Sequence, residues 1–219
     1  MTDNVRLLPR VAEPPADLHT LLEQRRSIRR LADGPVSAET LGRLSEAVQR
    51  TPAAFNLAPW HVVIVRDERA AFWDVIEAGF RAGLSEERLE RYLDRLAGFR
   101  PGSGAILIYE DRSVLPKLRD AWQISDAQAY AFVQQGIGMV QLALWLALTN
   151  DGLVTSLQHW EWLVEDRLAE FTEVPTEQFK LSAIMPIGYA NEPPRVVERP
   201  AAHQVVSFDR YTSLNGSGT

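Results

Sequence analysis

The 219-residue chain contains no cysteine, which excludes disulfide bonds, thiolate nucleophiles and zinc sites built on cysteine. Lysine is almost absent too, because 21 of the 23 basic residues are arginine. The net charge of −6 and the pI near 5.3 disfavour a broad nucleic-acid-binding surface, which would need to be basic.

Long apolar runs are also missing. The longest, Ile137 to Leu148, is interrupted by Gln141 and is shorter than the roughly 20 residues of a membrane-spanning helix. The N-terminal sequence MTDNVRLLPRVAEPPADL has no apolar segment of the kind found in signal peptides. With 46% apolar and 24% charged residues, the composition predicts a soluble globular protein, by default cytoplasmic.

Common catalytic motifs are absent as well. GIGMVQ, starting at Gly136, lacks the third glycine of a dinucleotide fingerprint and falls within a predicted helix. The four histidines have no metal-ligand spacing, and Ser156 lacks the flanking glycines of a nucleophile elbow. The acidic run LSEERLERYLDRL is typical of a solvated helix face. If the chain is an enzyme, a cofactor therefore supplies its chemistry.

Hydrophobic periodicity predicts one layered α/β or α+β fold. The long helix Asp126–Asn150 is poor in charge, so we expect it to be buried nearly all round, in a domain centre or at a subunit interface. Pro186 predicts an edge strand or the end of strand pairing. Helices are expected after Asp17 and Ser37 and at 70–81, 86–96 and 164–171, and strands at 60–65, 105–110, 153–158 and 181–188.

Four arginines occupy six positions after the first predicted helix, at Arg25, Arg26, Arg29 and Arg30. One interpretation is surface charge that complements the C-terminal end of the helix dipole. The other is a phosphate site, since Arg25, Ser27 and Arg29 offer two guanidinium groups and a hydroxyl at close range.

These residues belong to one of four segments that resemble elements of the FMN-dependent nitroreductase family. The family carries R-x-S-x-R, P-S-S-x-N-x-Q-P-W, a glycine-led strand and a late P-x-G strand, in this order. The final element of the third segment resembles the compact branch of the family, in which LQH precedes an aromatic residue. The segments here are RRSIR from Arg25, PAAFNLAPW from Pro52, GLVTSLQHW from Gly152 and MPIGYANEPPR from Met185.

The resemblance implies an α+β sandwich with a central, mainly antiparallel sheet of four or five strands flanked by helices. It also implies an intertwined homodimer with FMN sites at the interface. NAD(P)H would reduce FMN in a ping-pong cycle, and a nitroaromatic, a quinone or a similar flat acceptor would reoxidise it. We expect an N-terminal arm at 1–16, one FMN-binding domain at 17–195, and a tail at 196–219 that packs on the partner subunit.

Carried over by position, the resemblance implies three groups of FMN-binding residues and no catalytic or metal-binding residue. The isoalloxazine ring would be lined from the other subunit by Pro52, Ala53, Ala54 and Asn56. Gln158 and His159 would lie beside the ring, with backbone amides toward its N5 and O4 edge. The phosphate and ribitol would be held by Arg25, Arg26, Ser27 and Arg29, with Gly188 and Arg195 closing over the phosphate.

The sequence departs from the family at Ala53 and Ala54, where paired serines are usual, and at Ala58, where glutamine is usual. The lost hydrogen bonds would weaken FMN binding or alter its potential without removing a catalytic group. Two alternatives follow: a flavin-binding store, sensor or stress-response protein with little turnover, or an arginine-patch module that binds RNA or an acidic partner. The negative net charge opposes the second.

Overall fold

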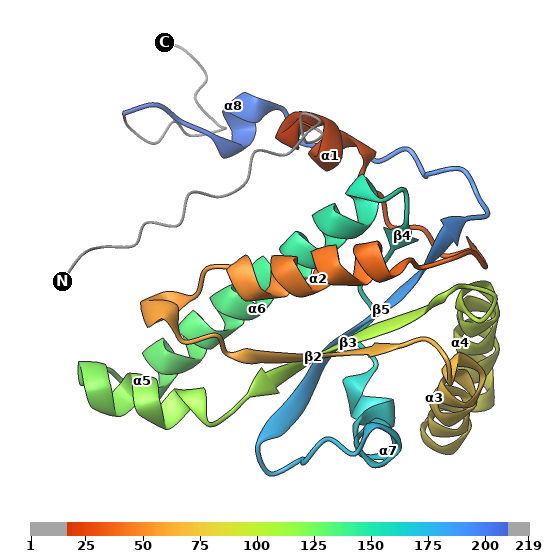
Figure 1. The fold of residues 1–219 in the computed structure, drawn as a ribbon, viewed down its shortest axis with the longest axis horizontal. Helices are drawn as coiled ribbons and strands as arrows, with labels where there is room; N and C mark the ends of the chain where they lie inside the picture. The colour runs from red at the N-terminus through yellow and green to blue at the C-terminus, as the bar shows by residue number, and fades with distance from the viewer. Residues whose placement is uncertain (1–16, 210–219) are drawn as a thin grey trace.

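The centre of the molecule is a five-stranded sheet in which all pairings between the strands are antiparallel (Figure 1). The computed structural model describes residues 17–209, so the predicted arm at 1–16 and the end of the tail at 210–219 lie outside it. The strand order is β1-β5-β3-β2, and β4 also pairs with β5. The expected α+β architecture is confirmed. The strands are β1 (Leu31–Ala32), β2 (Trp60–Val65), β3 (Gly104–Asp111), β4 (Val154–Thr155) and β5 (Phe179–Ala190).

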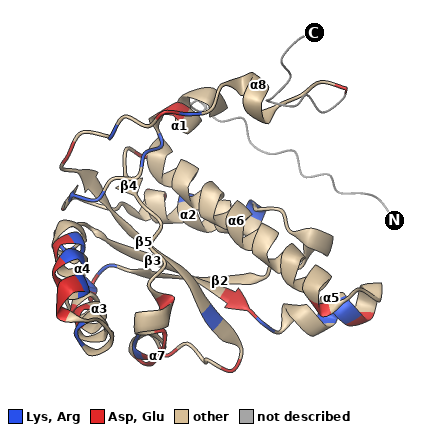
Figure 2. Ribbon diagram, turned by 180° about the vertical axis from the view of Figure 1, so that it is seen from behind, with Lys and Arg blue, Asp and Glu red and all other residues tan. Residues whose placement is uncertain are grey.

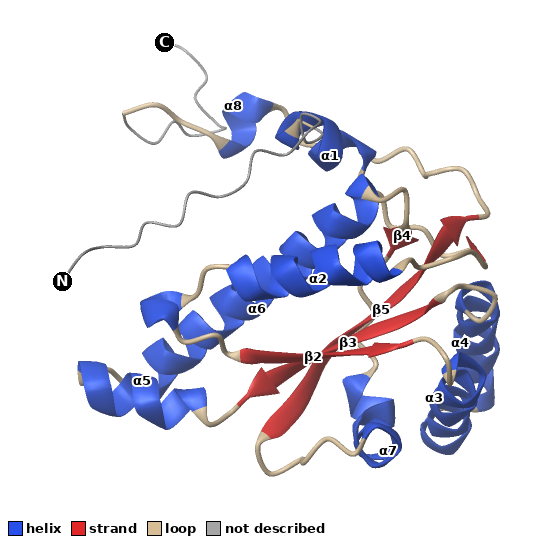
Figure 3. Ribbon diagram, in the orientation of Figure 1, coloured by secondary structure: helices blue, strands red, loops and turns tan. Residues whose placement is uncertain are grey.

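Helices cover both faces of this sheet (Figure 3). Helices α2, α5 and α6 pack on one face, and α3, α4 and α7 pack on the other. Helices α1 and α8 lie near each other, apart from the sheet (Figure 1). The bounds are α1 Leu18–Gln24, α2 Ala38–Arg50, α3 Arg69–Gly83, α4 Glu86–Phe99, α5 Val114–Trp122, α6 Asp126–Asn150, α7 Glu161–Thr172 and α8 Ala202–Val205, with a 3-10 turn at Ala54–Asn56.

Strand β3 is apolar along most of its length because both of its faces are covered. Ile106 and Ile108 point into the core beneath α6, while Leu107 and Tyr109 point into the core beneath α3 and α7. Alternate side chains of a strand face opposite sides of the sheet, so one strand contributes to both cores.

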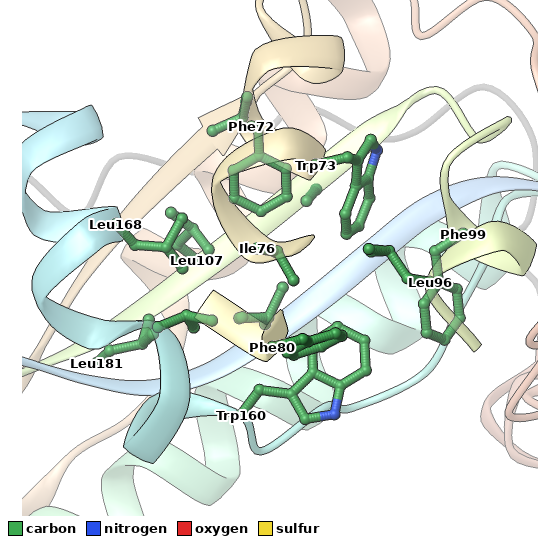
Figure 4. Close-up of a cluster of buried hydrophobic side chains, with 14 of the residues drawn as sticks. Phe72, Trp73, Ile76, Phe80, Leu96, Phe99, Leu107, Trp160, Leu168 and Leu181 are labelled. Carbon is green, nitrogen blue, oxygen red and sulfur yellow. The ribbon is translucent and has the colours of Figure 1, made fainter. Parts of the chain in front are cut away.

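The core beneath α3, α4 and α7 combines aliphatic side chains with a group of aromatic rings (Figure 4). Phe80 of α3 meets Trp160 edge to face, with ring centroids 4.9 Å apart. Trp160 is only 3% exposed and directly follows His159. This core therefore fixes the loop between β4 and α7.

The position of β5 corrects the expectation drawn from Pro186. β5 lies inside the sheet, with β3 on one side and β1 and β4 on the other, so the edge assignment is wrong. Pro186 lies opposite Ala105 of β3. On the β4 side, pairs form at Thr155 with Ile187 and at Gln158 with Ile184, and the described chain has no pair between them. A proline lacks an N–H, so it is tolerated where the ladder is interrupted in this way.

Helix α6 is less buried than its composition predicts. One face packs against the core, but Met139 and Leu142 on the opposite face are 39% and 44% exposed. By length and composition alone this helix could cross a membrane, with a mean hydropathy of 1.4 in its most apolar window. The core helices of soluble proteins pass the same test, so this evidence is weak. The exposed face rules out the centre of a domain as the place of this helix, and its burial at a subunit interface stays a prediction.

Four further elements differ from the expectation. β4 contains only Val154–Thr155, because the chain leaves the ladder before Ser156. Helices α5 and α8 and the two-residue strand β1 were not expected from the sequence pattern, since none has a long periodic segment.

Candidate functional site

The loop between α1 and β1 carries the arginine cluster and is docked against β4. The backbone N–H of Ile28 donates to the carbonyl of Thr155 at 3.2 Å, and Ser27 forms an isolated bridge with Thr155. Ile28 is 2% exposed, so it anchors the loop in the core. The structure thus brings together two of the four segments identified in the sequence.

The other side of this loop is docked on α4. Arg30 forms a two-pronged ion pair with Asp94, at 2.7 and 2.9 Å, and also donates to the Asp94 carbonyl. Gly98, one turn further along α4, lies against the loop backbone, and a Cβ there would overlap the Arg29 carbonyl oxygen. Glu192 accepts hydrogen bonds from the backbone amides of Arg29 and Arg30, at 2.6 and 3.2 Å. The loop is therefore held from both sides.

Three of the four arginines of this loop lack acidic partners among the described residues, whereas the fourth, Arg30, is paired with Asp94. Arg25, Arg26 and Arg29 form no ion pair with any described residue, and the buried Nε of Arg29 has no hydrogen-bond partner there. The Arg25 guanidinium instead lies 4.5 Å from the centre of the Trp145 ring. Carboxylate partners are present for Arg30, Arg43, Arg50, Arg66, Arg69, Arg81, Arg100 and Arg119.

Two arginines outside the predicted set, Arg95 and Arg199, add to the positive charge around this loop. Burial, and then the charges of Arg199 and Arg26, lower the pKa of Arg25. Burial, and then the charge of Arg29, lower the pKa of Arg95 on α4, with Arg195 contributing further. Positive groups crowd together at a cost unless an anion joins them. The arginine cluster therefore has the character of an anion site.

Arg95 and Arg199 were missed because neither belongs to one of the four motifs: Arg95 lies in the acidic run and Arg199 in the C-terminal tail. Arg95 falls in the acidic run that predicts a solvated helix face, although its spacing from Arg91 is that of neighbours on one side of a helix. Figure 2 shows acidic and basic residues mixed along α3 and α4. Only the contact between α4 and the loop distinguishes Arg95 from those solvated residues.

The loop after β4 contains the buried polar residues Ser156 and Gln158, which are 2% and 4% exposed. The Gln158 side chain donates to Ser156 Oγ at 2.9 Å, and its backbone amide donates to Ile184 at 2.9 Å. Both the side-chain amide and the backbone N–H of Gln158 therefore already donate hydrogen bonds within the protein. The backbone N–H of His159 has no hydrogen-bond partner among the described residues, and neither has the buried hydroxyl of Thr155. Both groups therefore have unused hydrogen-bonding capacity beside the arginine loop, with His159 exposed and Thr155 0% exposed.

The segment from Pro52 to Asn56 is not part of this pocket within one chain. It follows the C-terminal end of α2, while the arginine loop lies near the start of that helix (Figure 1). Phe55 and Asn56 have left-handed backbone angles, with φ of 55° and 57°. Phe55 stacks on Trp122 at 4.0 Å, and Asn56 is exposed. If this segment lines the same site, it must come from a second copy of the chain.

The last two predicted residues have different surroundings. Gly188 lies where a Cβ would be 2.8 Å from the Ala32 carbonyl and 3.1 Å from Gly102 Cα, so close packing explains this glycine. Its predicted role over a phosphate has no support in this geometry. Arg195, by contrast, contributes positive charge next to Arg95.

The arrangement is suited to binding a phosphate-bearing ligand rather than a metal. Unpaired guanidinium groups, the Ser27 hydroxyl and the Thr155 hydroxyl are donors that phosphate oxygens accept. Within residues 17–209, no group of three or more His, Asp or Glu side chains could hold a metal ion.

Comparison with known proteins gives a consistent result. A structure of the nitroreductase CinD from Lactococcus lactis in complex with chloramphenicol has a TM-score of 0.78 and 25% identity, covering 89% of this chain and 100% of that one. A nitroreductase with bound FMN from Desulfitobacterium hafniense shares the fold, with a TM-score of 0.65, 17% identity and coverage of 88% and 97%.

Sequence comparison adds a shorter match and a family. A protein described as NADH dehydrogenase from Thermus thermophilus is 46% identical over 54 residues, which is 25% of this chain and 26% of that protein. The chain thus aligns with about a quarter of that relative. The model of the nitroreductase family matches residues 22–189. Because this match extends over most of the sequence and the fold agrees with it, the chain belongs to the nitroreductase family.

Proposed function

We propose that the chain is an FMN-dependent NAD(P)H oxidoreductase that passes electrons to nitroaromatics, quinones or similar flat acceptors. The observation that carries this proposal is the group of arginines without carboxylate partners on the loop docked against β4. FMN, when bound, supplies the redox chemistry, so the protein needs to bind and orient rather than to provide an acid or a nucleophile. FMN in a relative of the same fold supports the cofactor, and the short match to an NADH dehydrogenase supports the donor.

The residues of the pocket fit this cofactor in separate ways. Arg25, Arg26, Ser27 and Arg29 are proposed to hold the phosphate and ribitol, with the charges of Arg95, Arg195 and Arg199 nearby. The unpaired Nε of Arg29 and hydroxyl of Thr155 would gain partners from the ligand. The backbone N–H of His159, which has no partner among the described residues, is proposed to donate to a polar edge of the ring, while the backbone N–H of Gln158 already donates to Ile184.

The ring-lining residues Pro52, Ala53, Ala54 and Asn56 are proposed to reach the site from a second subunit. The exposed face of α6 supports such a dimer, since Met139 and Leu142 lie beside an apolar groove of about 400 Å³ that also includes Pro52. Exposed apolar surface of this kind is characteristic of protein–protein interfaces. The dimer would then place Asn56 against the partner's pocket.

Leu142→Arg is expected to convert the dimer into monomers and to lower FMN content, because it introduces an unpaired charge at the centre of this face. Light scattering and flavin absorbance measure the two effects. Trp162→Arg, at a residue 54% exposed on α7, is the control and should leave a dimer. A Leu142→Arg protein that remains a flavin-bound dimer would contradict the assignment of the interface to α6.

The second candidate is a flavin-binding protein with little turnover, favoured by the alanines at positions 53 and 54. Both candidates predict a yellow protein that releases FMN on denaturation, at about one per chain. They differ in steady-state oxidation of NADH or NADPH with a quinone or a nitroaromatic as acceptor. Turnover supports the oxidoreductase. Bound FMN without turnover supports the store or sensor, and a protein that neither contains nor takes up FMN contradicts both.

A further inference from the structure

The turn between α2 and β2 has a backbone conformation that one of its residues does not favour. Phe55 and Asn56 are consecutive residues with φ of 55° and 57°, in the left-handed region. Asparagine tolerates this region, whereas a residue with a bulky side chain, such as phenylalanine, rarely adopts it. Such a conformation persists only where the surrounding structure holds it. Contacts from outside the turn must therefore keep Phe55 in place.

Hydrogen bonds account for only part of what holds this turn. The backbone N–H of Asn56 donates to the carbonyl of Ala53 at 3.0 Å, which closes the turn. Ala53 and Ala54 have no hydroxyl group that could bond to the neighbouring backbone, as serines in turns do. The side-chain amide of Asn56 forms no hydrogen bond with any residue of the described chain. The polar groups of the turn thus leave the conformation of Phe55 unexplained.

Two aromatic side chains hold the ring of Phe55 from outside the turn. The ring stacks on that of Trp122, the last residue of α5, with centroids 4.0 Å apart and an angle of 19° between the planes. Phe132 of α6 meets the Phe55 ring edge to face, with centroids 5.8 Å apart. The turn, the end of α5 and the first half of α6 lie together at one end of the molecule (Figure 1). Trp122 and Phe132 form an aromatic clamp around Phe55.

Trp122 is the member of this clamp that has no place in either hydrophobic core. It is 53% exposed, and within residues 17–209 its one ring contact is with Phe55. Its position is nevertheless fixed, because the backbone N–H of Gln123 donates to the carbonyl of Arg119 and closes the last turn of α5. A firmly placed tryptophan that contacts a strained residue is suited to maintaining the conformation of that residue.

We propose that Trp122 is a positioning residue for the flavin site and that it acts through Phe55. By keeping Phe55 in the left-handed conformation, it fixes Asn56 and the rest of segment 52–56 in the orientation that reaches the FMN of the other subunit. The clamp takes the place of the side-chain hydrogen bonds that Ala53 and Ala54 cannot form. This role rests on the proposed function, because segment 52–56 lines the flavin only if that function holds.

The test is titration of flavin-free protein with FMN, with light scattering to check that each variant keeps the oligomeric state of the wild type. Trp122→Ala should raise the Kd about three- to tenfold, because the released turn then spends only about a third to a tenth of its time in the clamped conformation. Trp122→Phe keeps a ring for stacking and should stay within about twofold of the wild type. Trp162→Ala is the matched control, since Trp162 on α7 is 54% exposed, and it should bind FMN normally.

A second background shows whether Trp122 acts through Phe55. Glycine adopts the left-handed conformation readily and offers no ring to hold, so Trp122→Ala should have no further effect on the Kd in a Phe55→Gly protein. The same three- to tenfold loss in both backgrounds, or a Trp122→Phe protein as weak as Trp122→Ala, would overturn the inference.

Cleavage of flavin-free protein by chymotrypsin after Phe55 tests the clamp without reference to FMN. A protease acts on the locally opened chain, so cleavage should be at least about threefold faster in Trp122→Ala than in the wild type and unchanged in Trp162→Ala. Faster cleavage with an unchanged Kd would mean that the clamp does not serve the flavin site and would overturn the inference. A protein that takes up no FMN but shows this difference in cleavage would contradict the proposed function while supporting the clamp.

Discussion

Alanine at both Arg25 and Arg29 is expected to strip the protein of FMN. Each charge-assisted hydrogen bond to a phosphate contributes about 1.5–3 kcal/mol, so loss of two should raise the Kd of FMN at least about 100-fold. Neither side chain has a carboxylate partner in the described chain, so their removal breaks no ion pair there. Fluorescence titration of flavin-free protein with FMN gives the Kd, and circular dichroism checks that the fold is retained.

Arg119→Ala is the matched control for this double variant. Arg119 is an exposed arginine of α5 whose side chain pairs with Asp120 and Asp126, and an exposed pair of this kind contributes little. The control should bind FMN as tightly as the wild type. An unchanged Kd in the double variant would contradict the assignment of the phosphate to Arg25 and Arg29. Arg95 and Arg199 would then be the next positions to replace.

Gly98→Ala is expected to both destabilise the protein and weaken FMN binding. The added methyl group would overlap the Arg29 carbonyl oxygen, so the arginine loop must move away from α4. Overpacking of this kind costs about 1–3 kcal/mol in the free energy of unfolding. Because Arg29 is displaced together with its backbone, FMN affinity should fall as well. Urea unfolding and FMN titration measure the two effects on one sample.

Gly42→Ala separates this effect from helix propensity. Gly42 lies within α2, and apart from its chain neighbours and the backbone of the helix itself no atom lies within 4 Å of the position its Cβ would occupy. Replacing a glycine in a helix by alanine stabilises the helix by up to about 1 kcal/mol, so this variant should be slightly more stable and bind FMN normally. If Gly98→Ala behaved as Gly42→Ala does, the docking of the loop on α4 would not matter for the site.

Segments with strong local patterns were predictable from sequence. β2 occupies Trp60–Val65 and α6 occupies Asp126–Asn150, as the apolar run and the helical periodicity predict. Helix α5 and strand β1 lack such patterns and appear only in the structure. β1 shows why: its two residues form a strand only because they pair with Tyr189 and Ala190, which are far away in sequence.

Candidate residues divide in a similar way. The motifs located Arg25, Ser27, Arg29 and His159 without any knowledge of contacts. They could not show that the backbone N–H of Gln158 donates to the carbonyl of Ile184, or that Gly188 is enclosed by backbone atoms. Such hydrogen bonds and close contacts form between segments that are distant in sequence.

By itself, the sequence determined the kind of chemistry available: no cysteine, no recognisable metal site, a cluster of arginines and a set of family motifs. Only the tertiary structure decided which charges are free. Arg30 and Arg29 are neighbours, yet Arg30 is neutralised by Asp94, 64 residues away, while Arg29 has no carboxylate partner in the described chain. Helix α4 also brings Arg95 close enough to Arg29 for the two charges to interact. Composition and spacing fix which groups exist, but the free energy of a charge depends on its neighbours in space, and these are set by folding.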